Sequence, residues 1–178
     1  MNHSEPSQKK LDPIDREGLE RLAALGKADP SVVKTVRCRT VAEGKFRHLN
    51  FIRNLEVHVI DEPPALLGED TAPNPSEAVL AALGSCLAVG IHANAVSRGI
   101  CIERLEVELE GDLNITSVWG TGDLSEKPVG FTEVRAKVKL EADRPDEELA
   151  QLIEHSRNWS PVANSLTRPV HLVVSKSD

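Results

Sequence analysis

A run of 20 residues without a charged side chain, from Ala78 to Ser97, is the feature that most constrains the fold of this chain. A run of that length is long enough to span a bilayer as a helix. It contains Gly84, His92 and Asn94 as well as several alanines, so its transfer into lipid is only weakly favourable. We therefore predict a helix over residues 75–98 that is buried in the middle of a soluble fold, with no membrane span.

The ends of this helix are marked by residue type. Asn74 is a good N-cap, Pro75 suits the first helical position and Gly99 suits the residue after the end. Alternating apolar residues predict strands over 32–41, 51–60, 102–110, 131–141 and 169–175. Further helices are expected over 13–26, 145–157 and after Ser160-Pro161, with a loop over 61–75. This order of elements is typical of an α+β fold.

The sequence predicts an N-terminal extension and one main domain. Residues 13–26 form a short helix with an apolar stripe of Ile14, Leu19, Leu22 and Leu25, and Asp29-Pro30 then breaks the chain. We therefore expect residues 1–30 to be a helical extension and residues 31–178 to form the main domain.

Composition removes several classes of function. The net charge is −7 and there is no basic run, so we expect no nucleic-acid partner. The three cysteines lack CxxC spacing and no two histidines have ligand spacing, which predicts neither a disulfide framework nor a metal site. No glycine-rich phosphate loop is present, and we expect no cofactor. The polar N-terminus lacks an apolar signal core, so a reducing cytoplasm is expected.

Cys86 is the first candidate for chemistry because it lies halfway along the uncharged helix. A free cysteine in such a place is usually a small core residue, and it becomes reactive when a nearby cation or helix end stabilises the thiolate. Arg53 supplies such a cation, since it shares the parity of the apolar residues in the predicted strand 51–60. A buried guanidinium needs a partner, which could be the Cys86 thiolate or Glu77. The alternatives are a core cysteine and an arginine that reaches solvent.

Residues 74–99, NPSEAVLAALGSCLAVGIHANAVSRG, resemble the central helix of the OsmC/Ohr family, the osmotically inducible and organic hydroperoxide resistance proteins. The later segments FTEVRAKVKLE, DEELAQLIEHSRN and WSPVANSL follow the family's order, so the resemblance covers residues 32–176. It implies an OsmC-like α+β fold, with sheets wrapped around central buried helices. It also implies an intertwined homodimer with two sites at the subunit interface.

The resemblance further implies a reaction. Active members of the family reduce organic hydroperoxides: one cysteine attacks the peroxide and becomes a sulfenic acid, and a second cysteine condenses with it to a disulfide. A dithiol reductant then reopens that disulfide. An arginine and a glutamate hold the attacking thiolate.

Carried over by motif, Cys86 matches the attacking cysteine, and the second cysteine's position is held by Ser160. Serine cannot form a disulfide, and from the residues alone Ser160 is a helix N-cap before Pro161. The family glutamate lies ten residues before the cysteine, where this chain has Ser76. Glu77 is one residue further on, turned by about 100° around the helix.

Two questions remain: which arginine stabilises the thiolate, and whether another cysteine replaces the missing second one. The family position suggests an arginine near Arg39 or Arg47, whereas strand parity favours Arg53. Cys101 follows the end of the same helix, about 18 Å from Cys86 along the axis, beyond the separation of about 7 Å that a disulfide allows. Cys38, in the first predicted strand, stays open as a replacement for the second cysteine, although we favour an inward-facing core position for it.

These observations lead to three hypotheses. The first is a thiol-dependent hydroperoxide reductase, with Cys86 as nucleophile, an arginine as thiolate stabiliser and Glu77 as its orienter. An external small-molecule or protein thiol would then resolve the sulfenic acid, because Ser160 cannot. The second is a non-catalytic protein that binds a small apolar ligand in a dimer-interface pocket. The third is a purely structural dimer. The reaction of Cys86 with an organic hydroperoxide discriminates among them.

Overall fold

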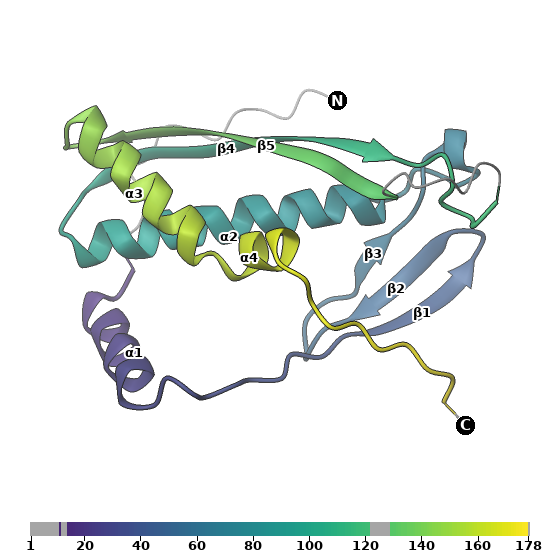
Figure 1. Ribbon diagram of the computed structural model, residues 1–178, viewed down its shortest axis with the longest axis horizontal. Helices are drawn as coiled ribbons and strands as arrows, with labels where there is room; N and C mark the ends of the chain where they lie inside the picture. Colours follow the sequence, from purple (N-terminus) through teal and green to yellow (C-terminus); the bar gives the residue numbers. More distant parts are fainter. Residues whose placement is uncertain (1–10, 12–13, 122–128, 178) are drawn as a thin grey trace. The chain divides into compact units, whose positions relative to one another are not determined.

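The computed structural model describes residues 11, 14–121 and 129–177. The chain divides into two compact units, residues 22–82 and residues 1–21 with 83–178, and each is described by itself. The elements, all but η1 labelled in Figure 1, are α1 (Arg16–Ala28), β1 (Arg39–Gly44), β2 (Arg47–Phe51), β3 (His58–Ile60), the 3₁₀ turn η1 (Pro64–Leu66), α2 (Pro75–Ser97), β4 (Ile102–Asn114), β5 (Gly130–Ala142), α3 (Asp146–Trp159) and α4 (Pro161–Thr167).

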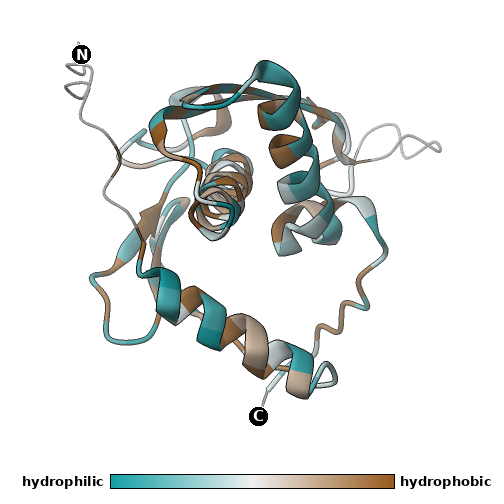
Figure 2. Cartoon of the chain, turned by 90° about the vertical axis from the view of Figure 1, so that its left-hand side faces the viewer, coloured by the Kyte–Doolittle hydropathy of each residue, from teal (hydrophilic) through white to brown (hydrophobic). Residues whose placement is uncertain are grey.

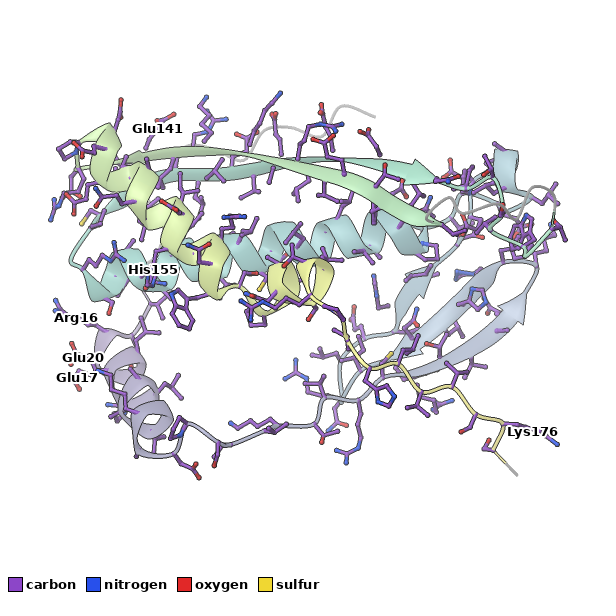
Figure 3. The ribbon with its side chains drawn as sticks, in the orientation of Figure 1. Arg16, Glu17, Glu20, Glu141, His155 and Lys176 are labelled. Atoms are coloured by element: carbon purple, nitrogen blue, oxygen red, sulfur yellow. The ribbon has the colours of Figure 1, made fainter. Side chains whose placement is uncertain are left out.

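The larger unit is built on a long antiparallel hairpin of β4 and β5. Apolar residues face each other across it, with Leu105 opposite Leu140 and Val107 opposite Val138. Charged residues alternate with them, and Glu141 points away from the helices in Figure 3. The C-terminal part of α2 and the whole of α3 lie on one side of the hairpin (Figures 1 and 2). The period-two pattern thus gave β4 and β5 correctly, although both strands are longer than expected.

The core of this unit lies between the hairpin, α2 and α3. Its buried residues are Ile91, Ala95, Ile100, Ile102, Leu149 and Leu152. Two glycines of α2 allow the elements to approach closely. A Cβ on Gly84 would lie 2.7 Å from Leu109 Cδ1 of β4, and one on Gly90 would lie 3.3 Å from Ser156 Cβ of α3. The helix is therefore held against both neighbours by small residues.

Only one face of α2 is buried, so the expectation of a fully buried helix holds for that face alone. The buried residues are Leu83, Gly84, Leu87, Ile91 and Ala95. The opposite face carries Ala81, Ala82, Ser85 and Val89, which are exposed. By length and composition alone the helix is able to cross a membrane, a criterion that core helices of soluble proteins also meet. Its apolar residues are instead divided between a packed face and an open one.

The smaller unit contains a three-stranded antiparallel sheet in the order β1-β2-β3. Buried Asn50 links the three strands, because its side chain accepts a hydrogen bond from Thr40 Oγ1 and donates one to the His58 carbonyl. The single strand expected over 51–60 is wrong, because only Phe51, at the end of β2, and His58–Ile60, which form β3, are in strands. The chain turns between β2 and β3, where Arg53 has a φ of 52° and is exposed. The apolar parity assigned to Arg53 therefore does not exist.

Two further strand expectations need correction. Residues 32–38 have no regular structure and β1 begins only at Arg39, while residues 169–177 form no strand. Both segments expose valines, among them Val33, Val36 and Val174. A strand forms only where a neighbouring strand accepts its backbone hydrogen bonds, and within the described chain neither segment has one. Cys38 lies in the first segment and is exposed, so its expected core position is also wrong.

A buried carboxylate organises the loop between β3 and α2. Asp61 is 0% exposed, and it accepts hydrogen bonds from Thr71 Oγ1 at 2.7 Å, Thr71 N at 3.1 Å and Glu62 N at 2.8 Å. These bonds, with the Thr71 hydroxyl first, lower the pKa of Asp61 to about 2. The folded loop therefore stabilises the ionised form of the Asp61 carboxyl group.

Replacing Asp61 with asparagine is expected to flatten the acid limb of the stability curve. The folded pKa lies below the unfolded pKa of 3.8, so the ionised carboxylate stabilises the fold above pH 3.8. This contribution is lost as the pH falls towards about 2. The variant should unfold at a lower temperature at pH 7 and differ less from the wild type at pH 2. Thermal unfolding at pH 2–7 measures this, with Asp70→Asn, an exposed position in the same loop, as control. Parallel curves for wild type and D61N would contradict the assignment.

Candidate functional site

Two of the residues that the sequence singles out meet in the larger unit. Cys86 lies in the middle of α2 and is partly exposed, while Ser160 joins α3 to α4 and is 3% exposed. Ser160 Oγ donates a hydrogen bond to Cys86 Sγ at 3.1 Å. The two positions are 74 residues apart in sequence, so the fold brings them together.

The position of Ser160 follows from its local sequence. It has an extended backbone, Pro161 begins α4 directly after it, and its Oγ accepts a hydrogen bond from Ala163 N at 3.1 Å. The expected N-cap role is therefore confirmed. Asn164 Nδ2 also donates to the Ser160 carbonyl at 2.8 Å. Because the Ser160 hydroxyl oxygen accepts its hydrogen bond from the first turn of α4, its single proton remains free to point at the sulfur of Cys86.

This arrangement favours sulfur chemistry at Cys86. A hydroxyl that donates to a charged acceptor forms a stronger hydrogen bond than one that donates to a neutral acceptor, so the Ser160 hydroxyl binds a thiolate more tightly than a thiol. Cys86 keeps part of its surface exposed, so a small molecule has access to it. A partly exposed thiol that accepts a hydrogen bond from an oriented hydroxyl makes Cys86 the candidate for nucleophilic chemistry in this unit.

The other two cysteines form no disulfide within the described chain. Cys38 and Cys101 are free and exposed. Because α2 continues without a break to Ser97, the separation expected between Cys86 and Cys101 along the helix is retained. Cys101 lies just before β4, where its backbone N donates to Asp143 Oδ1 at 2.9 Å.

Glu77 forms a capping box at the start of α2. Its backbone N donates to Asn74 Oδ1 at 2.8 Å, and its Oε2 accepts from Asn74 N at 2.8 Å. The expected N-cap is thus confirmed. Glu77 precedes Cys86 by nine residues, which is about 14 Å along the helix. The contact that Glu77 makes is structural, and its expected role as orienter stays a prediction.

The three candidate arginines all belong to the smaller unit. Arg53 is exposed in its turn, and the guanidinium of Arg39 lies over the Phe51 ring, 4.1 Å from its centroid. Arg47 Nε pairs with Glu43 Oε2 at 2.8 Å. Among the described residues, Arg47 Nη1 is one of two buried side-chain polar atoms without a hydrogen-bond partner, and Glu62 Oε2 is the other. Which arginine serves Cys86 stays a prediction.

A pocket of about 460 Å³ beside Ser160 was missed by sequence reasoning. Its walls are Arg157, Asn158, Trp159, Ala163, Asn164, Thr167 and Arg168. No motif marks these residues, and within the segment WSPVANSL only Ser160 occupies a family position. In residues 11, 14–121 and 129–177, no group of three or more His, Cys, Asp or Glu side chains is placed to hold a metal ion.

Comparison with known proteins places this site in a family context. The family model for OsmC-like proteins matches residues 68–175, a range that includes both Cys86 and Ser160. The comparison with curated proteins finds no match. The resemblance expected from the central helix is therefore confirmed at the level of the family.

Three solved structures illustrate the likeness in fold. An OsmC-like protein from Mycoplasma pneumoniae has a TM-score of 0.65 at 15% identity, covering 76% of this chain and 89% of that one. An OsmC-like protein of unknown function from Vibrio cholerae gives 0.61 at 16%, covering 75% and 94%. An organic hydroperoxide resistance protein from Legionella pneumophila gives 0.54 at 21%, covering 76% and 91%. At these identities the likeness shows the α+β fold alone.

Proposed function

Because the chain belongs to the OsmC-like protein family, we propose that it is a thiol-dependent reductase of organic hydroperoxides that works through Cys86. The observation that carries this proposal is the hydrogen bond from Ser160 Oγ to Cys86 Sγ. It puts an oriented donor beside the thiol at the position where the family resemblance expects a second sulfur. Solved relatives named for organic hydroperoxide resistance support the choice of substrate class.

The proposed first step is attack by the Cys86 thiolate on one peroxide oxygen. The O–O bond breaks, the sulfur takes one oxygen to become a sulfenic acid, and the other oxygen leaves with a proton as an alcohol. The Ser160 hydroxyl stabilises the thiolate before attack. Because Ser160 has no sulfur, an external thiol must reduce the sulfenic acid.

For the arginine that the resemblance implies, we favour Arg47 over Arg53. Arg47 Nη1 is a buried N–H donor with no partner among the described residues, and such a donor is costly unless a ligand or another group accepts from it. Arg53, in contrast, is exposed to water in a turn. The role therefore goes to the residue with unused hydrogen-bonding capacity.

Intact mass after one equivalent of an organic hydroperoxide tests the proposed function. We expect a gain of one oxygen on Cys86 that a sulfenic-acid trap captures and an added thiol reverses, because Ser160 holds the contact with Cys86 where the resemblance implies a second cysteine. Peptide mapping assigns the site against exposed Cys38 and Cys101. An unmodified Cys86 that also resists alkylation in the folded protein would favour a non-catalytic binder of small apolar ligands.

We also propose that the protein is a homodimer. The open face of α2 carries apolar residues, and the segments 32–38 and 169–177 expose valines without a strand partner in the described chain. A second copy of the chain provides both an apolar surface and strand edges for these features. The family resemblance implies the same assembly.

Sedimentation at micromolar concentration is expected to give a dimer. Val89→Glu puts a charge on the open face of α2 and should shift the protein towards monomer or aggregate, because a buried unpaired charge is strongly unfavourable. Leu22→Glu on α1 is the matched control, since Leu22 and Val89 are both 66% exposed. A wild-type protein that sediments as a folded monomer would rule the dimer out.

A further inference from the structure

The pocket beside Ser160 is connected to the reactive sulfur by hydrogen bonds. Two of its wall residues bind Ser160 directly: Ala163 N donates to its Oγ and Asn164 Nδ2 donates to its carbonyl. Ser160 Oγ in turn donates to Cys86 Sγ at 3.1 Å. A molecule in this pocket is therefore held next to the residue that contacts the sulfur.

The pocket is basic although the chain as a whole is acidic. Its walls contain Arg157 and Arg168 and, among the described residues, no aspartate or glutamate, whereas the net charge of the chain is −7. Arg157 Nη1 donates to Asn158 Oδ1 at 3.2 Å, and among the described residues neither arginine forms an ion pair. A hollow lined by two arginines and by no described carboxylate favours an anionic ligand.

The remaining walls suit a small ligand with an organic body. Trp159 is 75% exposed and supplies an aromatic surface. Its ring is tilted against that of His155, labelled in Figure 3, with 6.4 Å between the centroids. Asn158 and Asn164 add amide groups. A volume of about 460 Å³ is enough for a short thiol that carries a carboxylate.

We infer that this pocket binds the external reductant of Cys86, and that this reductant is a small thiol bearing a carboxylate. The inference rests on the proposed function and names the co-substrate that it requires. Arg157 and Arg168 bind the carboxylate, while the thiol end reaches past Ser160 to the oxidised sulfur.

The chemistry of recycling then balances with two molecules of thiol. The first thiolate attacks the sulfur of the sulfenic acid, so that an S–S bond forms, the S–O bond breaks and the oxygen leaves as water. A second thiol attacks the reductant's sulfur in this mixed disulfide, which releases Cys86 as a thiol and forms the oxidised reductant. The two electrons taken from the thiols equal those delivered to the hydroperoxide.

Reduction of the pre-formed sulfenic acid by two thiols tests the inference. The protein is oxidised with one equivalent of cumene hydroperoxide, and the loss of sulfenic acid is timed with 3-mercaptopropionate, which is anionic, and with 2-mercaptoethanol, which is neutral. The variant is Arg157→Gln with Arg168→Gln. The control is Lys27→Gln with Arg98→Gln, which removes the same charge at two exposed positions outside the pocket.

We expect the pocket variant to slow reduction by 3-mercaptopropionate about tenfold more than reduction by 2-mercaptoethanol, since it loses charge-assisted hydrogen bonds to the carboxylate. The control should keep the wild-type ratio of the two rates. An unchanged ratio in the pocket variant, with normal formation of the sulfenic acid and a folded circular dichroism spectrum, would overturn this inference alone. A failure of the wild-type protein to form the sulfenic acid would overturn the proposed function and this inference together.

Discussion

Replacement of Ser160 by cysteine is expected to change the product of hydroperoxide treatment from a sulfenic acid to an intrachain disulfide. Ser160 Oγ already lies 3.1 Å from Cys86 Sγ, and a disulfide brings two sulfurs to about 2.0 Å. The longer C–S bond and a small side-chain rotation close most of the gap. The new thiol would therefore condense with the sulfenic acid before an external thiol arrives.

The measurement is intact mass after one equivalent of hydroperoxide. The wild type should gain one oxygen, whereas S160C should lose two hydrogens and become resistant to alkylation until a dithiol is added. Some stability is lost with the serine N-cap, about 1 kcal/mol. Ser165→Cys is the matched control, because Ser165 lies on the same short helix but is exposed and bonds to the Pro161 carbonyl. A persistent sulfenic acid in S160C would show that the two side chains do not meet in solution.

Replacement of Cys86 by serine is expected to reduce thiol-dependent hydroperoxide consumption to the uncatalysed background, a loss of at least about 100-fold. The hydroxyl that results has nearly the same size and still accepts a hydrogen bond from Ser160, so the fold should be kept. Serine is a far weaker nucleophile than cysteine at neutral pH. The loss would therefore report on chemistry and not on packing.

Turnover is measured with cumene hydroperoxide and 3-mercaptopropionate, with unfolding temperature as a parallel check. Cys101→Ser and Cys38→Ser are the controls, because both residues are free and exposed, and they should keep wild-type turnover. If C101S or C38S lost turnover while C86S kept it, the reaction would have to be moved to another thiol.

The elements that sequence predicted well are those whose partners lie nearby in the chain. The limits of α2 follow from the Asn74 capping box and from Gly99, which has a φ of 69°. The hairpin of β4 and β5 follows from the alternation of apolar and charged residues in both strands. The two strands are neighbours in the chain, so their apolar residues share one face when they pair. Local chemistry also identified Ser160 as a cap, because Pro161 directly follows it.

The elements that sequence missed depend on distant or unusual features. Residues 32–38 and 169–175 have the alternation of strands, but alternation cannot provide a neighbouring strand. The turn at Arg53 uses a positive φ in a residue other than glycine, which composition does not signal. The basic pocket combines Arg157 and Arg168, which line one hollow only after α3 and α4 have folded.

Ser160 both caps α4 and donates a hydrogen bond to Cys86, so the oxidation state of the sulfur is expected to affect the stability of α4. A helix of seven residues is marginal by itself, and the Ser160 hydroxyl holds its first turn while touching Cys86. An oxygen added to the sulfur on the side of that 3.1 Å contact would compete with the Ser160 hydroxyl for space, so we expect the cap on Ala163 to weaken. Oxidation of Cys86 is therefore expected to loosen α4 locally, which faster amide exchange at Ala163 would record.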